Sequence, residues 1–274
     1  MAVKTPLKWV GSKARLMPLL LPYLPKGQRL VEPFAGSCAV MMNTDYDEYL
    51  VADVNPDLIG FYRAAAAETS DLIERARHLF ETFNSEHGYY DSRDSFNHNG
   101  DPAWRPALFL YLNRHGFNGL CRYNKAGRFN VPYGKYKKPY FPENEIKAFA
   151  EKAKRATFVC SSYTETLGMV RAGDVVYCDP PYLTETANFT AYHENGFSQL
   201  DHGRLARRLR ALAANGVPVV ASNSDEDMVR YLFAGFESVS VIAPRSVGAA
   251  AGSQKKAAEL ILKGPFSAAV EASA

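Results

Sequence analysis

The sequence predicts an α/β fold, an open sheet covered by helices and interrupted by a mostly helical insertion. Short apolar stretches alternate with helical patterns near both ends of the chain, which is typical of α/β domains. The middle of the chain has few strand signals and many polar, Gly-rich and Pro-rich loops. We therefore expect residues 1–68 and 149–274 to form the sheet-bearing domain and residues 69–148 to form an inserted second domain.

In the first half, residues 30–34 predict a short buried strand, followed by the small-residue turn Ala35-Gly36-Ser37 and a helical stretch from Ala39. A second strand at residues 49–52 ends at Asp53. Residues 56–67 have helical composition, with Pro56 in the first turn. Within the insertion, the apolar spacing predicts helices at residues 71–83 and 104–113.

The second half resumes the alternation of strands and helices. We expect strands at 157–161, 175–178 and 217–222, and helices at 199–214 and 226–233. Two further strands, at 237–242 and 257–262, would form a closing antiparallel hairpin around a flexible region at 248–252. The final Ala/Ser-rich residues are expected to be a frayed tail.

Composition narrows the class of protein. A chain of 274 residues with 47% hydrophobic content can bury a core, and it has no run of eighteen apolar residues and no signal-peptide pattern, so we expect a cytoplasmic protein without a membrane segment. Its four cysteines are scattered singly, and its six histidines lack metal-ligand spacing. We expect reduced thiols, no metal and a monomer in solution.

A local basic stretch suggests the partner. Between Tyr111 and Pro142 there is no Asp or Glu, and the cations alternate with aromatic rings, amides and glycines: Arg114, Arg122, Lys125, Arg128, Lys135, Lys137 and Lys138. Most charge runs are solvated faces. Rings and amides that stack on and hydrogen-bond to bases, carried on irregular loops, instead favour a nucleic acid.

The most specific motif is Asp179-Pro180-Pro181-Tyr182, directly after a predicted strand. A proline turn would explain the two prolines but requires neither the acid nor the aromatic residue. The Asp179 carboxylate and the Pro180 carbonyl are suited to accept both N–H groups of a base amine, which directs the nitrogen lone pair at a methyl donor. Tyr182 is suited to stack on an extruded base.

Three loops are candidates for a cofactor. Phe34 and Gly36 follow the first strand, and Asp53 ends the next strand, where α/β folds bind a ribose. The alternatives are a simple tight turn at Gly36 and a helix N-cap at Asp53. Near the start, Lys13 and a helix N-terminus suit an amino-acid carboxylate, and Trp9 is either a cover for the cofactor or a core residue.

These motifs together resemble the Dam-type bacterial and phage DNA adenine methyltransferases over nearly the whole chain. The resemblance rests on Leu7-Lys8-Trp9-x-Gly11-x-Lys13, Val31-Glu32-Pro33-Phe34, Ala52-Asp53-x-Asn55, Leu110 to Arg114, Phe117 to Asn124, Phe129 to Pro132, Tyr136 to Phe141 and Asp179 to Tyr182. It implies a Rossmann-like methyltransferase sheet, S-adenosylmethionine as methyl donor, and methylation of adenine N6 in duplex DNA, usually at GATC.

The resemblance also implies roles for individual residues. Trp9, Lys13, Asp53 and Asp179 match cofactor-contacting positions, and residues 113–138 match a target-recognition segment. Arg122 is the candidate for a two-pronged contact with guanine, Asn118 for a base edge or the space left by the flipped base, and Phe117 for a wedge in the stack. The other expected DNA contacts are Lys8, Arg114, Leu120, Asn124, Pro132, Lys135, Tyr136, Lys137 and Lys138.

Three positions depart from the family pattern. Cys38 stands where a second glycine is usual, Lys135 where an arginine is common, and Gly11-Ser12 replaces the common Gly-Gly. A lysine does not reproduce the planar two-pronged contact of an arginine, so the base preference at Lys135 is open.

Two other functions fit the same motifs. One is a methyltransferase of the same fold acting on cytosine N4 or on adenine in RNA, and the other is a catalytically silent DNA-binding regulator. The recognition segment favours adenine in DNA over the first, and the presence of Asp53, Asp179 and Tyr182 argues against the second.

Overall fold

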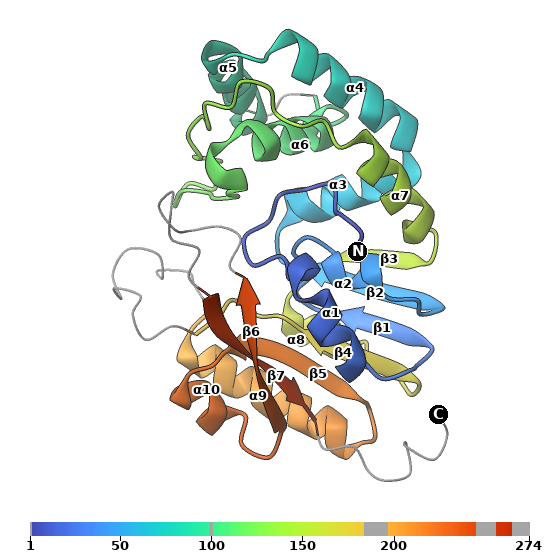
Figure 1. Ribbon diagram of the computed structural model, residues 1–274. Helices are drawn as coiled ribbons and strands as arrows, with labels where there is room; N and C mark the ends of the chain where they lie inside the picture. The colour runs from blue at the N-terminus through green and yellow to red at the C-terminus, as the bar shows by residue number, and fades with distance from the viewer. Residues whose placement is uncertain (1, 99–100, 184–196, 245–255, 265–274) are drawn as a thin grey trace.

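The computed structural model describes residues 2–98, 101–183, 197–244 and 256–264. The strands of this part of the chain form one mixed sheet with the order β3-β2-β1-β4-β5-β7-β6 (Figure 1). They are β1 Arg29–Glu32, β2 Glu48–Asp53, β3 Ala156–Cys160, β4 Asp174–Cys178, β5 Val219–Ser224, β6 Glu237–Pro244 and β7 Lys256–Lys263. The first five pair in parallel, whereas β7 runs antiparallel to both β5 and β6. The predicted α/β class and closing hairpin are confirmed.

The strand order reverses at β1, which lies between β2 and β4. Ligands of open α/β sheets bind outside the carboxyl ends of the strands at such a switch point. Here that edge carries Glu32 at the end of β1, Asp53 at the end of β2, and Asp179 directly after β4.

Apolar residues cover both faces of the sheet because helices pack on each side. In β4, Val175 and Tyr177 belong to the core shared with the helices of the first half of the chain, while Val176 and Cys178 face the core of the second half. The first face is covered mainly by α3 (Pro56–Ala67) and α7 (Glu143–Ala153), and the second by α8 (Tyr163–Leu167), α9 (Gln199–Ala214) and α10 (Asp227–Leu232).

The chain begins with short turns that pack near α2 (Ala39–Asn43): η1 (Lys13–Arg15), α1 (Met17–Leu20) and η2 (Leu21–Tyr23). Helices α4 (Thr69–Thr82), α5 (Glu86–Asn97) and α6 (Arg105–His115) then gather beyond α3, at the end of the molecule farthest from α9 and α10 (Figure 1). The turn η3 (Phe117–Gly119) follows α6. No helix in the described ranges is long and apolar enough to cross a membrane.

The predicted domain boundary at residue 148 falls inside α7, which packs on both α3 and β3. One hydrophobic core runs from the sheet through α3 into α4, α5 and α6. The division of the chain into two domains therefore stays a prediction.

Two helices have the predicted bounds, and each begins at a capping residue. Helix α3 spans the predicted residues 56–67, and its N-cap is Asn55, whose side chain accepts from the backbone N–H groups of Asp57 and Leu58. The alternative that Asp53 caps this helix is wrong. Helix α9 also has the predicted bounds, and a capping box at Ser198 starts it. The expected flexible region at 248–252 and the frayed tail lie outside the described residues.

Helix α5 was not predicted. Its residues include Gly88 and several Asp, Ser and Asn, which have low helix propensity. The helix is held instead by its cap and its packing: the Ser85 side chain accepts from the Gly88 backbone N–H, and Tyr89 and Phe96 are buried in the core with α6.

A buried ion pair holds the amino ends of β1 and β4 together. Arg29 donates from Nε to Asp174 Oδ1 at 2.9 Å and from Nη2 to Oδ2 at 2.7 Å, and this contact raises the pKa of Arg29. The Asp174 side chain is only 1% exposed. We expect Arg29→Ala to lower the free energy of unfolding in urea by about 3 kcal/mol, because it leaves a buried carboxylate without its main partner.

The control is Arg171, whose half-exposed side chain lies 4.0 Å from the same carboxylate. Since exposed ion pairs contribute little, Arg171→Ala should cost less than about 1 kcal/mol. Equal losses in the two variants would contradict the role of Arg29.

Candidate active site

Both carboxylate oxygens of Asp179 are held by side chains from distant parts of the sequence. Lys13 Nζ lies 2.8 Å from Oδ2, and Ser222 Oγ donates to Oδ1 at 2.8 Å. Ser222 in turn lies 2.9 Å from the hydroxyl of buried Tyr177. Burial raises the pKa of Asp179, while Lys13 and Ser222 oppose this shift because they stabilise the carboxylate. The strand end thus presents an oriented acceptor with a cation beside it.

Lys13 joins the catalytic motif to the predicted cofactor loops. It is buried, its ammonium also donates to the Gly11 carbonyl at 2.9 Å, and it lies 4.6 Å from the centre of the Tyr182 ring. An ammonium has three donors. The contacts with Asp179 and Gly11 use two of them, so Lys13 can still donate to one further acceptor.

Strand β5 and strand β7 hold the residues that follow Asp179. The Tyr182 hydroxyl donates to Glu259 Oε2 at 2.7 Å. The Leu183 N–H donates to Asn223 Oδ1 at 3.3 Å, and the Leu183 carbonyl accepts from the Ser224 hydroxyl. The segment 179–183 is therefore fixed at both of its ends by the end of β5.

The loops after β1 and β2, both candidates for cofactor binding, contact each other. Gly36 N–H donates to Asp53 Oδ2 at 3.1 Å, and Asn55 N–H donates to Asp53 Oδ1 at 3.0 Å. Gly36 has a φ of +46°, and a Cβ there would lie 3.1 Å from two ring atoms of Trp9. A glycine is therefore needed in this turn, and the indole of Trp9 covers it.

Phe34 lies in an aromatic cluster at the same edge. Its ring stacks on Tyr163 at 5.6 Å between centroids and meets Phe197 edge to face at 5.5 Å. Next along the loop, Cys38 adopts the left-handed conformation (φ 57°, ψ 29°) that favours the glycine usual at this position. Its side chain is fully buried, so the thiol fills space in the core that a glycine would leave open.

Sequence reasoning gave no role to Glu32, although it belongs to one of the quoted motifs. Its side chain is 2% exposed, and Oε1 has no hydrogen-bond partner among the described residues. Burial raises its pKa to about 8, and the negative charge of Asp179 adds to the shift. Glu32 is thus protonated at neutral pH.

This raised pKa predicts how stability depends on pH. The folded state retains the Glu32 proton up to about pH 8, whereas the unfolded chain loses it near pH 4.5. The contribution of protonated Glu32 to the free energy of unfolding is therefore complete below pH 4.5 and is lost as the pH rises to 8. Glu32→Gln cannot ionise. Relative to wild type, its free energy of unfolding should rise by roughly 2–4 kcal/mol between pH 5 and pH 8. Urea titrations of both proteins at both pH values measure this difference. The same difference at pH 5 and at pH 8 would show that Glu32 titrates normally.

On the predicted DNA side, Lys8, Asn118 and Tyr136 come together. Lys8 Nζ lies 4.2 Å from the centre of the Tyr136 ring, and the Asn118 N–H donates to the Tyr136 hydroxyl at 3.1 Å. Asn118 has a φ of 52°, and its neighbour Phe117 is 48% exposed and bonded through its N–H to the Pro132 carbonyl. An exposed aromatic ring on a fixed turn is suited to enter a base stack.

Arg122 lies on a second loop of this surface. Asn130 holds it, accepting from Nε at 2.7 Å through its side chain and from Nη2 at 3.1 Å through its carbonyl. The next residue, Tyr123, donates to buried Asp57 at 2.6 Å, which ties the loop to the start of α3. Asn124 is exposed and shapes the following turn by accepting from two backbone N–H groups.

The remaining predicted DNA contacts differ in exposure. Pro132, Lys135 and Lys137 are exposed, and Leu120 is partly buried. Arg114 is buried: its guanidinium donates to the Pro6 carbonyl, and burial lowers its pKa to about 10. In this arrangement Arg114 holds the N-terminal segment and is not part of the surface.

Asn113, which sequence reasoning left without a role, joins the two sides of the site. Its side chain accepts from the Lys8 N–H at 2.8 Å and donates to the carbonyls of Lys8 at 2.7 Å and Gly119 at 3.2 Å. A Cβ on Gly119 would lie 2.4 Å from the Lys8 side chain, so the Lys8 side chain packs directly against the Gly119 backbone. The segment that carries Trp9 and Lys13 is therefore fixed to the turn that carries Phe117 and Asn118.

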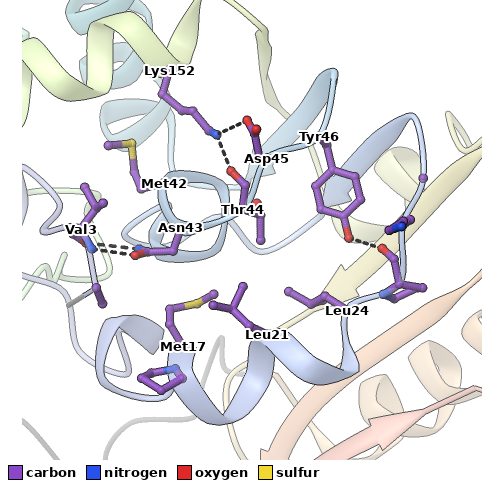
Figure 2. A pocket seen from close by; sticks show the side chains of 15 residues that line it. Val3, Met17, Leu21, Leu24, Met42, Asn43, Thr44, Asp45, Tyr46 and Lys152 are labelled. Carbon is purple, nitrogen blue, oxygen red and sulfur yellow. Dashed lines mark hydrogen bonds and ion pairs between the residues drawn. The ribbon is translucent and has the colours of Figure 1, made fainter. Parts of the chain in front are cut away.

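A cavity of about 890 Å³ lies at the opposite edge of the sheet, before β1 and β2 (Figure 2). Three charged residues line it, Lys26, Asp45 and Lys152, of which Lys152 and Asp45 pair with each other, and Asn43 bonds to the backbone of Val3. Within the described residues, no group of three or more His, Cys, Asp or Glu side chains could hold a metal ion. The candidate active site is therefore the carboxyl edge with Asp179.

Comparisons with known proteins identify the family of the chain. Residues 9–247 match the model of the D12 class N6 adenine-specific DNA methyltransferases. The chain is 53% identical to the retron Ec67 DNA adenine methylase of Escherichia coli, over 94% of this chain and 90% of the relative. It is 51% identical to a DNA adenine methylase of Serratia marcescens (82% and 84%) and 46% identical to that of Escherichia coli K12 (93% and 93%). The chain therefore belongs to the D12 class of N6 adenine-specific DNA methyltransferases.

Proposed function

We propose that this enzyme methylates adenine N6 at GATC sites in duplex DNA, after the adenine is flipped into a pocket formed by residues 179–182. The observation that carries the proposal is the pair of contacts on Asp179: Lys13 and Ser222 keep both oxygens oriented at the carboxyl end of β4, next to the Tyr182 ring. Family membership favours adenine in DNA over cytosine N4 or RNA.

In this proposal Asp179 and the Pro180 carbonyl accept the two N–H groups of the adenine amine. The lone pair of that amine is delocalised into the ring, and two fixed acceptors favour the pyramidal nitrogen that attacks a methyl group. Tyr182 stacks on the extruded base and offsets part of the few kcal/mol that flipping costs. Lys13 favours the ionised form of Asp179, which can only accept hydrogen bonds.

The family implies S-adenosylmethionine, which supplies the methyl group from a sulfonium. The residues present fit this donor. The turn at Gly36 has no side chain, so the donor can approach its backbone closely. Asp53 suits the hydroxyl groups of a ribose, and the remaining donor of Lys13 suits the carboxylate of the amino-acid part. Trp9, Phe34 and Asp179 would complete this site.

The DNA contacts are proposed from the surface around η3. Arg122, Asn118 and Phe117 would contact bases, and Lys8, Tyr136, Leu120 and Pro132 lie on the same group of loops. Asn124, Lys135 and Lys137 would contact phosphates, which position the duplex without reading its sequence.

The direct test uses plasmid DNA incubated with the purified enzyme and S-adenosylmethionine. Digestion with restriction enzymes that respond to adenine methylation at GATC should show complete modification, and nucleoside analysis should yield N6-methyladenine. Methylation at another sequence would refute the GATC assignment, and N4-methylcytosine would refute the base. A duplex that lacks adenine in the site is the negative control, and no labelled methyl group should reach it.

A further inference from the structure

The acid that contacts the catalytic tyrosine comes from the end of the chain. Glu259 lies on β7, opposite Ser224 of β5 and Val241 of β6. Because β7 runs antiparallel to the other strands of the site, its early residues lie beside the carboxyl end of β5 (Figure 1). A parallel strand in this place would put the same residues at the opposite edge.

The contact has the geometry of a strong hydrogen bond. The Tyr182 hydroxyl lies 2.7 Å from Glu259 Oε2, at the edge of the range for a hydroxyl donating to a carboxylate. Burial, together with the charges of Asp179 and Glu259, raises the pKa of Tyr182, so the phenol stays protonated and remains the donor. A ring held at its hydroxyl cannot swing about its Cα–Cβ bond, because that rotation would carry the hydroxyl away from Glu259.

The same edge also constrains the faces of the ring. Lys13 lies over one face, so a base that stacks on Tyr182 has the other face. A tyrosine held only by its backbone would be free to turn this face away from Asp179. The hydrogen bond to Glu259 keeps the stacking face and the acceptor Asp179 in one geometry.

We propose that Glu259 is a positioning residue, which acts through the Tyr182 hydroxyl to fix the ring against which the target base stacks. This role rests on the proposed base-flipping function. Glu259 touches neither the base nor the methyl donor in this assignment, and its effect should vanish when the hydroxyl of Tyr182 is absent.

A double-mutant cycle tests this, with wild type, Glu259→Ala, Tyr182→Phe and the double variant. Loss of a hydrogen bond to a charged group predicts that Glu259→Ala lowers kcat/KM for DNA by about 10-fold. In the Tyr182→Phe background the same change should alter kcat/KM by less than about 2-fold. Multiplicative losses in the double variant would overturn the proposal, because Glu259 would then act by another route, such as its charge.

A second readout follows the base itself. A duplex with 2-aminopurine at the target adenine becomes fluorescent when the base leaves the stack, and an ordered ring next to the base quenches this signal. Glu259→Ala and Tyr182→Phe should change the fluorescence of the bound duplex alike, with binding of S-adenosylhomocysteine and thermal unfolding unchanged. Unequal fluorescence, or lost S-adenosylhomocysteine binding, would contradict the positioning role.

The matched control is Glu237→Ala, an exposed acid on the neighbouring strand β6 that pairs with Lys263. It should leave kcat/KM and fluorescence unchanged, and a loss equal to that of Glu259→Ala would overturn the proposal as a general effect of removing charge from the hairpin. Failure of the proposed function has a different signature. The wild-type enzyme would then produce no N6-methyladenine at GATC and no change in 2-aminopurine fluorescence.

Discussion

Asp179→Ala should lower kcat for methyl transfer by roughly 10³-fold, while the Kd for DNA changes little. Removing a preorganised group that stabilises developing charge costs about 10² to 10³ in kcat in other enzymes. Here the change also leaves the buried ammonium of Lys13 without its carboxylate partner. Single-turnover transfer of labelled methyl groups to a GATC duplex, with DNA binding measured separately, tests both parts.

Asp179→Asn is the matched variant, because it keeps the shape and one oxygen acceptor but no charge. It should retain more DNA-dependent base flipping than the alanine variant and still lose most of the rate. Ser222→Ala removes only one donor to Asp179, so its loss should be much smaller. Normal turnover in Asp179→Ala would refute the assignment of the catalytic acceptor.

Arg122→Ala should relax discrimination at a single base pair of the site by about 1–3 kcal/mol. Asn130 orients the guanidinium, which suits it to the two-pronged contact with guanine. The ratio of kcat/KM for GATC to that for each single-base variant, measured at one fixed salt concentration, gives the effect. The preference should fall at one position and persist at the other three.

Arg128→Ala is the control on the same hairpin, since Arg128 is exposed there. Loss of a phosphate contact would weaken binding to all DNA sequences equally and would lower the salt dependence of binding. If Arg122→Ala behaves in this way, Arg122 contacts the backbone of DNA and does not read a base.

Where the sequence was enough, the information was local. The apolar stretches located the strands, helical composition with Pro56 in the first turn located α3, and the acid and prolines after β4 marked a strand end. Helix α5 was missed because its polar residues favour loops, and only the burial of Tyr89 and Phe96 against α6 stabilises it as a helix.

The site residues divide in the same way. Trp9, Lys13, Gly36, Asp53 and Asp179 belong to motifs that can be read from adjacent letters. Residues that act by supporting others are harder to find: Ser222 and Glu259 belong to no motif, and the motif that contains Asn113 does not show its supporting role. For Glu259 the available signal was an acid within an otherwise apolar strand, which does not identify its partner.

By itself the sequence determined the motifs to which catalytic and cofactor roles are proposed, their order, and the elements on which they lie, since these depend on residues close together in the chain. Only the tertiary structure decided that Lys13 pairs with Asp179, that β7 brings Glu259 to Tyr182, and that Arg114 is buried rather than on the proposed DNA-binding surface. The physical reason is that strand order, strand direction and burial follow from packing between distant segments, which local periodicity does not encode.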